Sequence, residues 1–239
     1  LYPEDITIMK NLGIQSYRLS ISWSRVIPDG IGRVNLDGIA YYKRLFSALI
    51  DAGISPMVTL YHWDLPQALE NLGGWRNRET AYAFKEYAQV CFEAFGNQVE
   101  SWITINEPWC IAYLGHLTGE HAPGHKSLEE ALKVIHHVNL AHGLAMQSYR
   151  ESKLTGKIGI TWNLAMHRPA TKNPLDIFAA KIALASESQI FTDPILKGYY
   201  PQVVKEELGW SFPIEVDDMR IISTPVDFVG INYYNEQAV

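Results

Sequence analysis

The chain has 239 residues, of which 47% are hydrophobic, 12% aromatic and 19% charged, a composition that supports a large core and excludes disordered, collagen-like and low-complexity proteins. Its 20 basic and 26 acidic residues give a net charge of -6 without runs of like charge, which argues against nucleic acid as a partner. Two cysteines are too few for a disulfide or zinc framework, and polar residues interrupt every apolar stretch before it reaches membrane-spanning length.

Helices and strands alternate along the chain. In order, the apolar periodicity and the capping residues predict a helix at 3–12, a strand at 17–23, a helix at 35–53, a strand at 56–63, a helix at 79–95, a strand at 101–107, a helix at 128–151, a strand at 157–163, a helical region at 174–196 and a strand at 226–234. Five strands separated by helices predict a parallel sheet covered by helices.

This order of elements fits either a closed barrel or an open doubly wound sheet. No glycine-rich phosphate turn follows the first strand, and polar and aromatic residues gather at the carboxyl ends of several strands, which favours the barrel. A barrel of this class needs eight strands, whereas the pattern supplies five. We therefore predict the α/β class, with residues 1–239 forming one domain, an incomplete (β/α)8 TIM barrel whose exposed sheet edges favour self-association.

Glu107 is the leading catalytic candidate. Ile103, Ile105 and Glu107 share a parity, so the carboxylate is expected to follow two buried aliphatic residues to the mouth of the barrel. Apolar and aromatic neighbours such as Trp109 favour the protonated form of a carboxyl, which suits a general acid, and Asn106 could donate a hydrogen bond to a substrate hydroxyl. The alternative is that Glu107 caps the following turn or pairs with an arginine.

Two further polar residues lie on predicted strands. His62 ends the second strand and can hydrogen-bond a neutral polyol, although a histidine that follows aliphatic residues is also a common core residue. Arg18 shares a strand face with Ser20 and Ser22. Because a charge cannot be buried unpaired without a large cost, Arg18 implies a carboxylate nearby.

Several tryptophans lie close to the predicted strand ends. Those at or just past a carboxyl end are Trp23, Trp63, Trp109 and Trp162. Each alone is an ordinary core residue, but four at one rim, beside Asn and His side chains, suit the flat faces of a sugar ring. Asn232 and Tyr234 extend this set on the last strand.

The sequence shows no motif for a metal or a cofactor. The sequence contains eight histidines, but neither a His-Glu-x-x-His string nor paired Cys and His residues with zinc-site spacing. A Gly-x-Ser-x-Gly turn and a P-loop are also missing from the sequence. We therefore expect neither a metal nor a cofactor.

Six motifs together point to a known family. They are Tyr-Arg-Leu-Ser-Ile-Ser-Trp-Ser-Arg at 17–25, Tyr-His-Trp-Asp-Leu-Pro at 61–66, Gly-Gly-Trp at 73–75, Thr-Ile-Asn-Glu-Pro-Trp at 104–109, His-Ala-Pro-Gly at 121–124 and Gly-Ile-Asn-Tyr-Tyr at 230–234. In this order, and over nearly the whole chain, they resemble glycoside hydrolase family 1, the β-glucosidase family. The resemblance implies a retaining β-glycosidase with Glu107 as its acid/base. Glutamate at this position resembles the O-glycosidases of the family, because the thioglucosidases carry glutamine there.

The resemblance also implies roles for other residues. His62 and Asn106 would contact hydroxyls of the non-reducing sugar, and Trp63 and Trp23 would support the sugar pocket. Arg18, Asn232 and Tyr234 would form the group that surrounds and orients the nucleophile. The implied partner is a small β-glucoside or oligosaccharide.

The chain departs from the family pattern at the nucleophile. A retaining mechanism uses two carboxylates about 5–5.5 Å apart. The family's Thr-Glu-Asn-Gly motif, on its seventh strand, does not occur here, and the five strands correspond to the second to sixth of the family. Asp64 and Glu236 are the only other acids at the predicted rim, and Asp64 is better explained as ordering a loop.

Three questions stay open at this point. The chain could belong to an active β-glycosidase completed by other segments, or it could be a truncated or degenerate sugar-binding barrel without catalysis. A phospho-β-glycosidase or a transglycosylase is a further alternative. The cysteine content favours the cytoplasm, but the sequence begins without Met in the middle of an expected helix, so secretion stays open.

Overall fold

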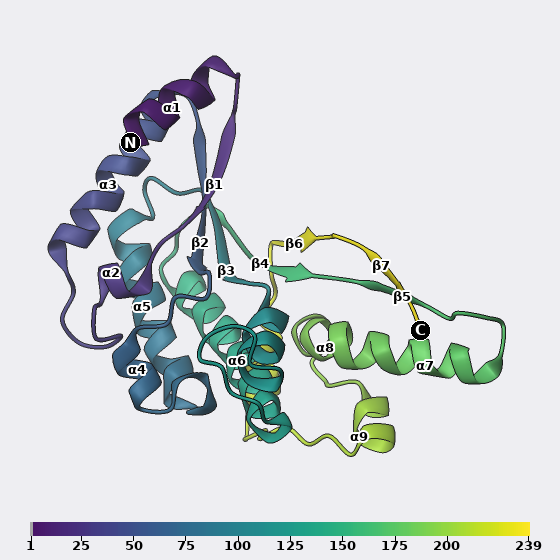
Figure 1. Cartoon of the computed structure of the whole chain (residues 1–239). Helices are drawn as coiled ribbons and strands as arrows, with labels where there is room; N and C mark the ends of the chain where they lie inside the picture. Colours follow the sequence, from purple (N-terminus) through teal and green to yellow (C-terminus); the bar gives the residue numbers. More distant parts are fainter. Residues whose placement is uncertain (1) are drawn as a thin grey trace.

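The computed structural model describes residues 2–239 (Figure 1). One sheet has the strand order β1-β2-β3-β4-β6, and every neighbouring pair in it is parallel. Its strands are β1 (Ser16–Ser20), β2 (Ser55–Tyr61), β3 (Ser101–Asn106), β4 (Lys157–Asn163) and β6 (Phe228–Asn232). The predicted parallel sheet of five strands, an incomplete TIM barrel, is confirmed.

Helices connect these strands. They are α1 (Tyr2–Asn11), α2 (Trp23–Val26), α3 (Leu36–Asp51), α4 (Gln67–Asn71), α5 (Glu79–Phe95), α6 (Leu128–Glu151), α7 (Pro174–Leu184), α8 (Ile190–Lys197), α9 (Gln202–Leu208) and α10 (Asp218–Ile222). Helices α5 and α6 cover one face of the sheet. Phe92 of α5 packs edge-to-face on Trp102 of β3 with ring centroids 5.1 Å apart, and Nδ1 of His142 in α6 lies 2.8 Å from Oγ1 of Thr104.

Capping and periodicity explain where the long helices lie. The side chain of Asn35 accepts a hydrogen bond from the Asp37 amide at 3.2 Å and so caps α3. At the start of α6, the hydroxyl of Ser127 accepts from the Glu130 amide at 3.3 Å. The bounds predicted for α5 and α6 are confirmed. Helix α5 has a buried stripe that continues to its last turn, whereas α6 is buried on all sides from Val134 to Met146.

The first strand is shorter than predicted. It ends at Ser20, and Trp23 begins the short helix α2 instead of ending the strand. The cause is packing, because the Trp23 indole stacks on the Tyr87 ring with centroids 5.0 Å apart, and its Nε1 donates to the Gly30 carbonyl at 3.1 Å. Alternation along a single strand does not reveal this insertion into the aromatic core.

Other differences concern short segments. The helical region at 174–196 is divided into α7 and α8 by a π-helical turn at Ala185–Gln189. A second parallel sheet, which the sequence pattern did not predict, pairs β5 (Met166–Arg168) with β7 (Glu236–Ala238). The short helices α4, α9 and α10 were not predicted either, because such segments carry too few residues to display a period.

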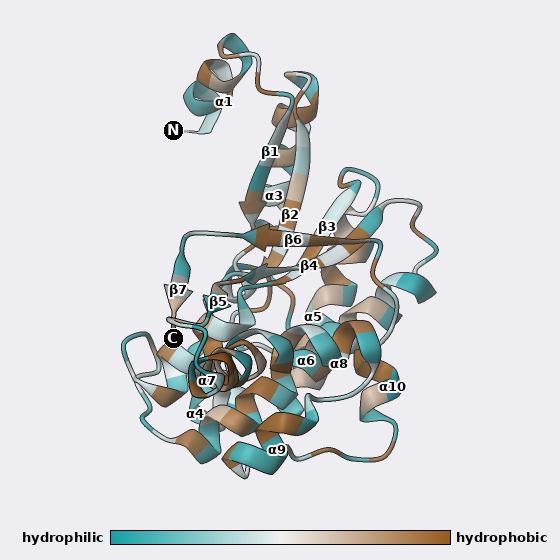
Figure 2. Cartoon of the chain, turned by 90° about the vertical axis from the view of Figure 1, so that its right-hand side faces the viewer, coloured by the Kyte–Doolittle hydropathy of each residue, from teal (hydrophilic) through white to brown (hydrophobic). Residues whose placement is uncertain are grey.

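The two outer strands of the main sheet, β1 and β6, have one neighbour each within residues 2–239. Val229 and Ile231 of β6 are 42% and 59% exposed, and the ribbon of β6 is mostly coloured as hydrophobic in Figure 2. The exposed edges expected from the strand count are therefore present.

Within residues 2–239, none of the helices is both long and apolar enough to span a membrane.

Gly143 sets the distance between α6 and α10. A Cβ atom added at this position would lie 2.3 Å from the carbonyl oxygen of Ile221. We expect Gly143→Ala to destabilise the chain by about 1–3 kcal/mol, because this clash outweighs the gain of about 1 kcal/mol in helix propensity. Urea unfolding measures the change, and Gln147→Ala on the same helix is the control. A more stable Gly143→Ala variant would contradict the close approach of the two helices.

Candidate active site

The candidate site lies where several parallel strands end. Glu107 directly follows β3, whose last residue is Asn106, and His62 directly follows β2. Asn232 is the last residue of β6, and Arg18 lies in β1. Parallel strands in a barrel bring their carboxyl ends to one edge, so residues distant in sequence meet there.

The backbone changes direction just before the site. Between Ile103 and Asn106, three residue steps on β3 oppose two steps on β4, which is a bulge. Glu107 then has a φ of 49°, in the left-handed region that non-glycine residues rarely occupy. Simple alternation would send the side chains of Asn106 and Glu107 to opposite faces, but the amide of Asn232 donates to both. The alternation of side chains along the strand therefore explains the direction of one of these two side chains, but not of both.

The Glu107 carboxyl is buried and held on both oxygens. Its Oε1 accepts hydrogen bonds from Nδ2 of Asn232 and, at 3.3 Å, from the hydroxyl of Tyr234. Its Oε2 accepts from the thiol of Cys110 at 3.2 Å. The negative charge of Glu107 raises the pKa of Tyr234, which keeps the phenol protonated as a donor. Glu107 is only 4% exposed. Amide, phenol and thiol groups, and not an arginine, donate hydrogen bonds to its carboxyl.

Arg18 contacts the neighbouring amide. Its guanidinium donates to Oδ1 of Asn106 and, at 3.3 Å, to Oγ1 of Thr59. Burial lowers the pKa of Arg18, and the negative charge of Glu107 opposes this shift. The expected carboxylate is therefore present in the site, but it acts through space, and the direct hydrogen bonds of Arg18 go to neutral groups.

His62 and Trp63 complete the wall on the β2 side. Nδ2 of Asn106 lies 3.4 Å from Nε2 of His62, a contact in which a neutral imidazole is the acceptor. Burial, with the nearby charge of Arg18, lowers the pKa of His62 and so favours this neutral form. Nε1 of Trp63 donates to the Asn106 carbonyl at 2.8 Å, and the Trp63 ring lies 5.4 Å from that of His121.

The four tryptophans of the predicted rim separate into two pairs. Trp23 and Trp162 are 0% and 3% exposed and belong to the core, so Trp23 is not placed for direct contact with a substrate and stays predicted as a support of the sugar pocket. Trp63 and Trp109 are half-buried at the site. The Trp109 ring stacks on that of Tyr113 with centroids 5.0 Å apart.

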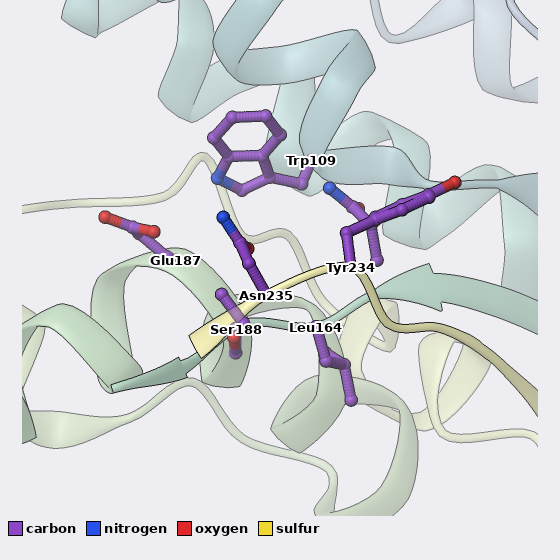
Figure 3. Close-up of a pocket in the computed structure, with 8 residues that line it drawn as sticks. Trp109, Leu164, Glu187, Ser188, Tyr234 and Asn235 are labelled. Carbon is purple, nitrogen blue, oxygen red and sulfur yellow. The ribbon is translucent and has the colours of Figure 1, made fainter. Parts of the chain in front are cut away.

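A cavity of about 150 Å³ adjoins the site (Figure 3). It is lined by Trp109, Asn163, Leu164, Ala165, Glu187, Ser188, Tyr234 and Asn235. The sequence analysis did not single out Asn163 or Glu187, although Asn163 ends the predicted strand at 157–163, the kind of position that indicated Glu107. Cys110 was also missed as a site residue, although its position three residues after Glu107 is a spacing that brings side chains together on a helical turn.

The site contains carboxyl, amide, phenol, imidazole and thiol groups. Within residues 2–239, no group of three or more His, Cys, Asp or Glu side chains is placed to hold a metal ion. The arrangement can exchange a proton at Glu107 and can hydrogen-bond hydroxyl groups through Asn106 and His62.

Known proteins with similar sequences are β-glucosidases and related enzymes. Beta-glucosidase A of Acetivibrio thermocellus is 45% identical over 100% of this chain and 54% of its own length. Beta-glucosidase A of Thermotoga maritima is likewise 45% identical, with the same two coverages. The 6-phospho-beta-glucosidase GmuD of Bacillus subtilis is 42% identical over 100% of this chain and 52% of its own length.

Solved structures agree with these relatives. The psychrophilic beta-glucosidase BglU from Micrococcus antarcticus superposes with a TM-score of 0.95 at 45% identity, over 99% of this chain and 51% of that one. The Thermotoga maritima beta-glucosidase in complex with castanospermine gives 0.94 at 44% identity, over 99% and 54%. The chain thus spans about half the length of the relatives it matches. The family model for glycosyl hydrolase family 1 matches residues 1–239, and the chain belongs to this family.

Proposed function

We propose that this chain carries the acid/base half of the catalytic site of a retaining β-glycosidase that hydrolyses β-linked O-glycosides. One observation supports this most directly. The Glu107 carboxyl is buried at the ends of the strands, with donors on both oxygens and with Asn106 and His62 beside it. A buried carboxyl at the strand ends, with groups beside it that can bind hydroxyls, is placed to exchange a proton with a glycosidic oxygen.

In the proposed reaction, Glu107 protonates the glycosidic oxygen while a second carboxylate attacks the anomeric carbon. Glu107 then removes a proton from the water that hydrolyses the glycosyl intermediate. Asn106 and neutral His62 hydrogen-bond the sugar hydroxyls, and Trp63 supplies a flat apolar wall. Asn232 and Tyr234 contact Glu107, and Arg18 contacts Asn106; these three residues are proposed to orient the second carboxylate.

The second carboxylate is proposed to come from segments other than this chain. Glu236 lies in β7, where its Oε1 pairs with Nε of Arg168 at 2.7 Å. Burial raises the pKa of Asp64, and a hydrogen bond from Ser22 opposes the shift. These contacts favour a role for Asp64 in ordering its loop, and neither acid matches the family's nucleophile.

Hydrolysis of p-nitrophenyl β-glucoside tests the proposal. The 239-residue chain alone is expected to release no p-nitrophenol, because the covalent step lacks its nucleophile. A longer chain with all eight barrel strands, or this chain mixed with a polypeptide that carries the remaining strands, is expected to hydrolyse the substrate. Turnover by the short chain alone would show that it contains a substitute nucleophile.

The alternatives give different results in the same assay. A non-catalytic sugar-binding barrel would leave both preparations inactive while the longer one still binds deoxynojirimycin, which a solved Thermotoga maritima relative binds. Preference for a 6-phospho-β-glucoside would favour the specificity named for the Bacillus subtilis relative. The exposed edges of β1 and β6 support association with complementing segments or with a second copy. The cytoplasmic location stays a prediction.

A further inference from the structure

The thiol of Cys110 lies against the carboxyl of Glu107. Sγ is 3.2 Å from Oε2, and the Cys110 amide also donates to the Glu107 carbonyl at 3.0 Å. Cys110 begins the π-helical turn Cys110–Leu117, which follows Glu107 after two residues. Both side chains are at least nine-tenths buried, at 6% and 4% exposure. The contact is therefore shielded from water and fixed by the local backbone.

The thiol keeps its proton in this position. Burial raises the pKa of Cys110 far above the usual value, and the hydrogen bond to Glu107 and the charge of that carboxylate raise it further. Cys110 is therefore an S–H group and not a thiolate, which excludes a nucleophilic role. Its available chemistry is to donate or accept a hydrogen bond.

A second contact fixes the sulfur from the other side. Nδ2 of Asn163, at the end of β4, lies 3.7 Å from Sγ of Cys110 and can only donate. The sulfur therefore accepts from Asn163, which leaves the S–H bond free to point at Oε2 of Glu107. This contact connects two strand ends through the thiol.

A buried acid/base group needs partners in both of its protonation states. An ionised carboxylate only accepts hydrogen bonds, whereas a protonated carboxyl must also donate one, and an unpaired buried group is costly. The side-chain NH2 of Asn232 can only donate, so it can bond only to a carboxyl oxygen that accepts. A thiol is a weak donor and a weak acceptor, so it can serve Oε2 in either state.

We propose that Cys110 is the positioning residue of Glu107, donating S–H to Oε2 while the carboxyl is ionised and accepting from Oε2–H when it is protonated. The thiol then holds one orientation of the carboxyl in both protonation states before substrate binds. The catalytic meaning of this exchange rests on the proposed function of Glu107, but the exchange itself is a property of this chain.

Infrared spectroscopy of the S–H stretch tests the exchange in the 239-residue chain. Only two thiols contribute to this band, Cys110 and the fully buried Cys91 of α5. In Cys91→Ala, the S–H band of Cys110 is the only one that remains. If Cys91→Ala does not fold, Cys110→Ala identifies the band of Cys91, and the other band then belongs to Cys110. In Glu107→Gln the Cys110 band is expected to move to higher wavenumber, because an amide oxygen is a weaker acceptor than a carboxylate.

The pH dependence supplies the second readout. As Glu107 is protonated, the Cys110 band is expected to shift together with the carboxyl C=O band, while the Cys91 band stays in place. A Cys110 band that responds neither to Glu107→Gln nor to protonation of the carboxyl would overturn the proposal. Neither readout depends on hydrolysis, so a failed exchange and a failed glycosidase assignment are distinguishable.

Discussion

Replacing Glu107 by Gln in a longer chain that supplies the nucleophile is expected to slow hydrolysis of alkyl β-glucosides by about 10²–10⁴-fold. Glutamine keeps the size of the side chain and an oxygen that can accept from Asn232 and Tyr234. It cannot protonate the glycosidic oxygen, so a poor leaving group departs as an alkoxide. The measurement is kcat/KM for a methyl β-glucoside.

A substrate with an activated leaving group separates acid catalysis from misfolding. With 2,4-dinitrophenyl β-glucoside, departure needs little protonation, so kcat/KM of Glu107→Gln is expected to stay close to the unmodified value. The matched control is Glu86→Gln, which alters an exposed carboxylate on α5. Equal losses on both substrates would indicate a structural role for Glu107, and an unchanged rate on the alkyl glucoside would remove it from the mechanism.

The sequence predicts the long elements well because their information is local. Helices α5 and α6 and strand β4 have the bounds that periodicity and flanking residues predict. The three residues of β5 and the seven residues of α9, fewer than two helical turns, are too few to display a period. Trp23 shows another limit, since its place in the core depends on Tyr87, which is distant in sequence.

Only part of the site could be predicted from the sequence. The position of Glu107 at a strand end follows from the sequence, and the family resemblance names most of its neighbours. The bulge before it is a mismatch in residue count between β3 and β4, which neither strand reveals alone. Cys110 resembles an ordinary core residue in an apolar segment, and its contacts with Oε2 of Glu107 and Nδ2 of Asn163 distinguish it from Cys91.

The second large effect is expected at Asp218, a buried carboxylate that joins α10 to the rest of the chain. Arg78 donates to both of its oxygens, with Nη1 2.9 Å from Oδ2, and Nε2 of His136 lies 2.8 Å from Oδ2. The amide of Glu215 also donates to Oδ2 at 2.8 Å. Asp218→Asn removes the buried charge that pairs with Arg78 and leaves it the exposed Glu215, whose Oε2 lies 3.5 Å from Nε, so we expect a loss of about 3–5 kcal/mol in the free energy of unfolding.

The pH dependence of this loss identifies its cause. Burial alone would raise the pKa of Asp218, but the hydrogen bonds from Arg78, the Glu215 amide and His136 outweigh it and lower the pKa from 3.8 to about 2. Because the folded state favours the ionised form, its contribution is complete above pH 3.8 and is lost as the pH falls towards 2. Urea unfolding should therefore show a smaller difference between the unmodified chain and Asp218→Asn at pH 3 than at pH 7. The neighbouring Asp217 pairs with Arg220 at the surface, so Asp217→Asn should change stability by no more than about 0.5 kcal/mol. A similarly small effect of Asp218→Asn would contradict the importance of this buried network.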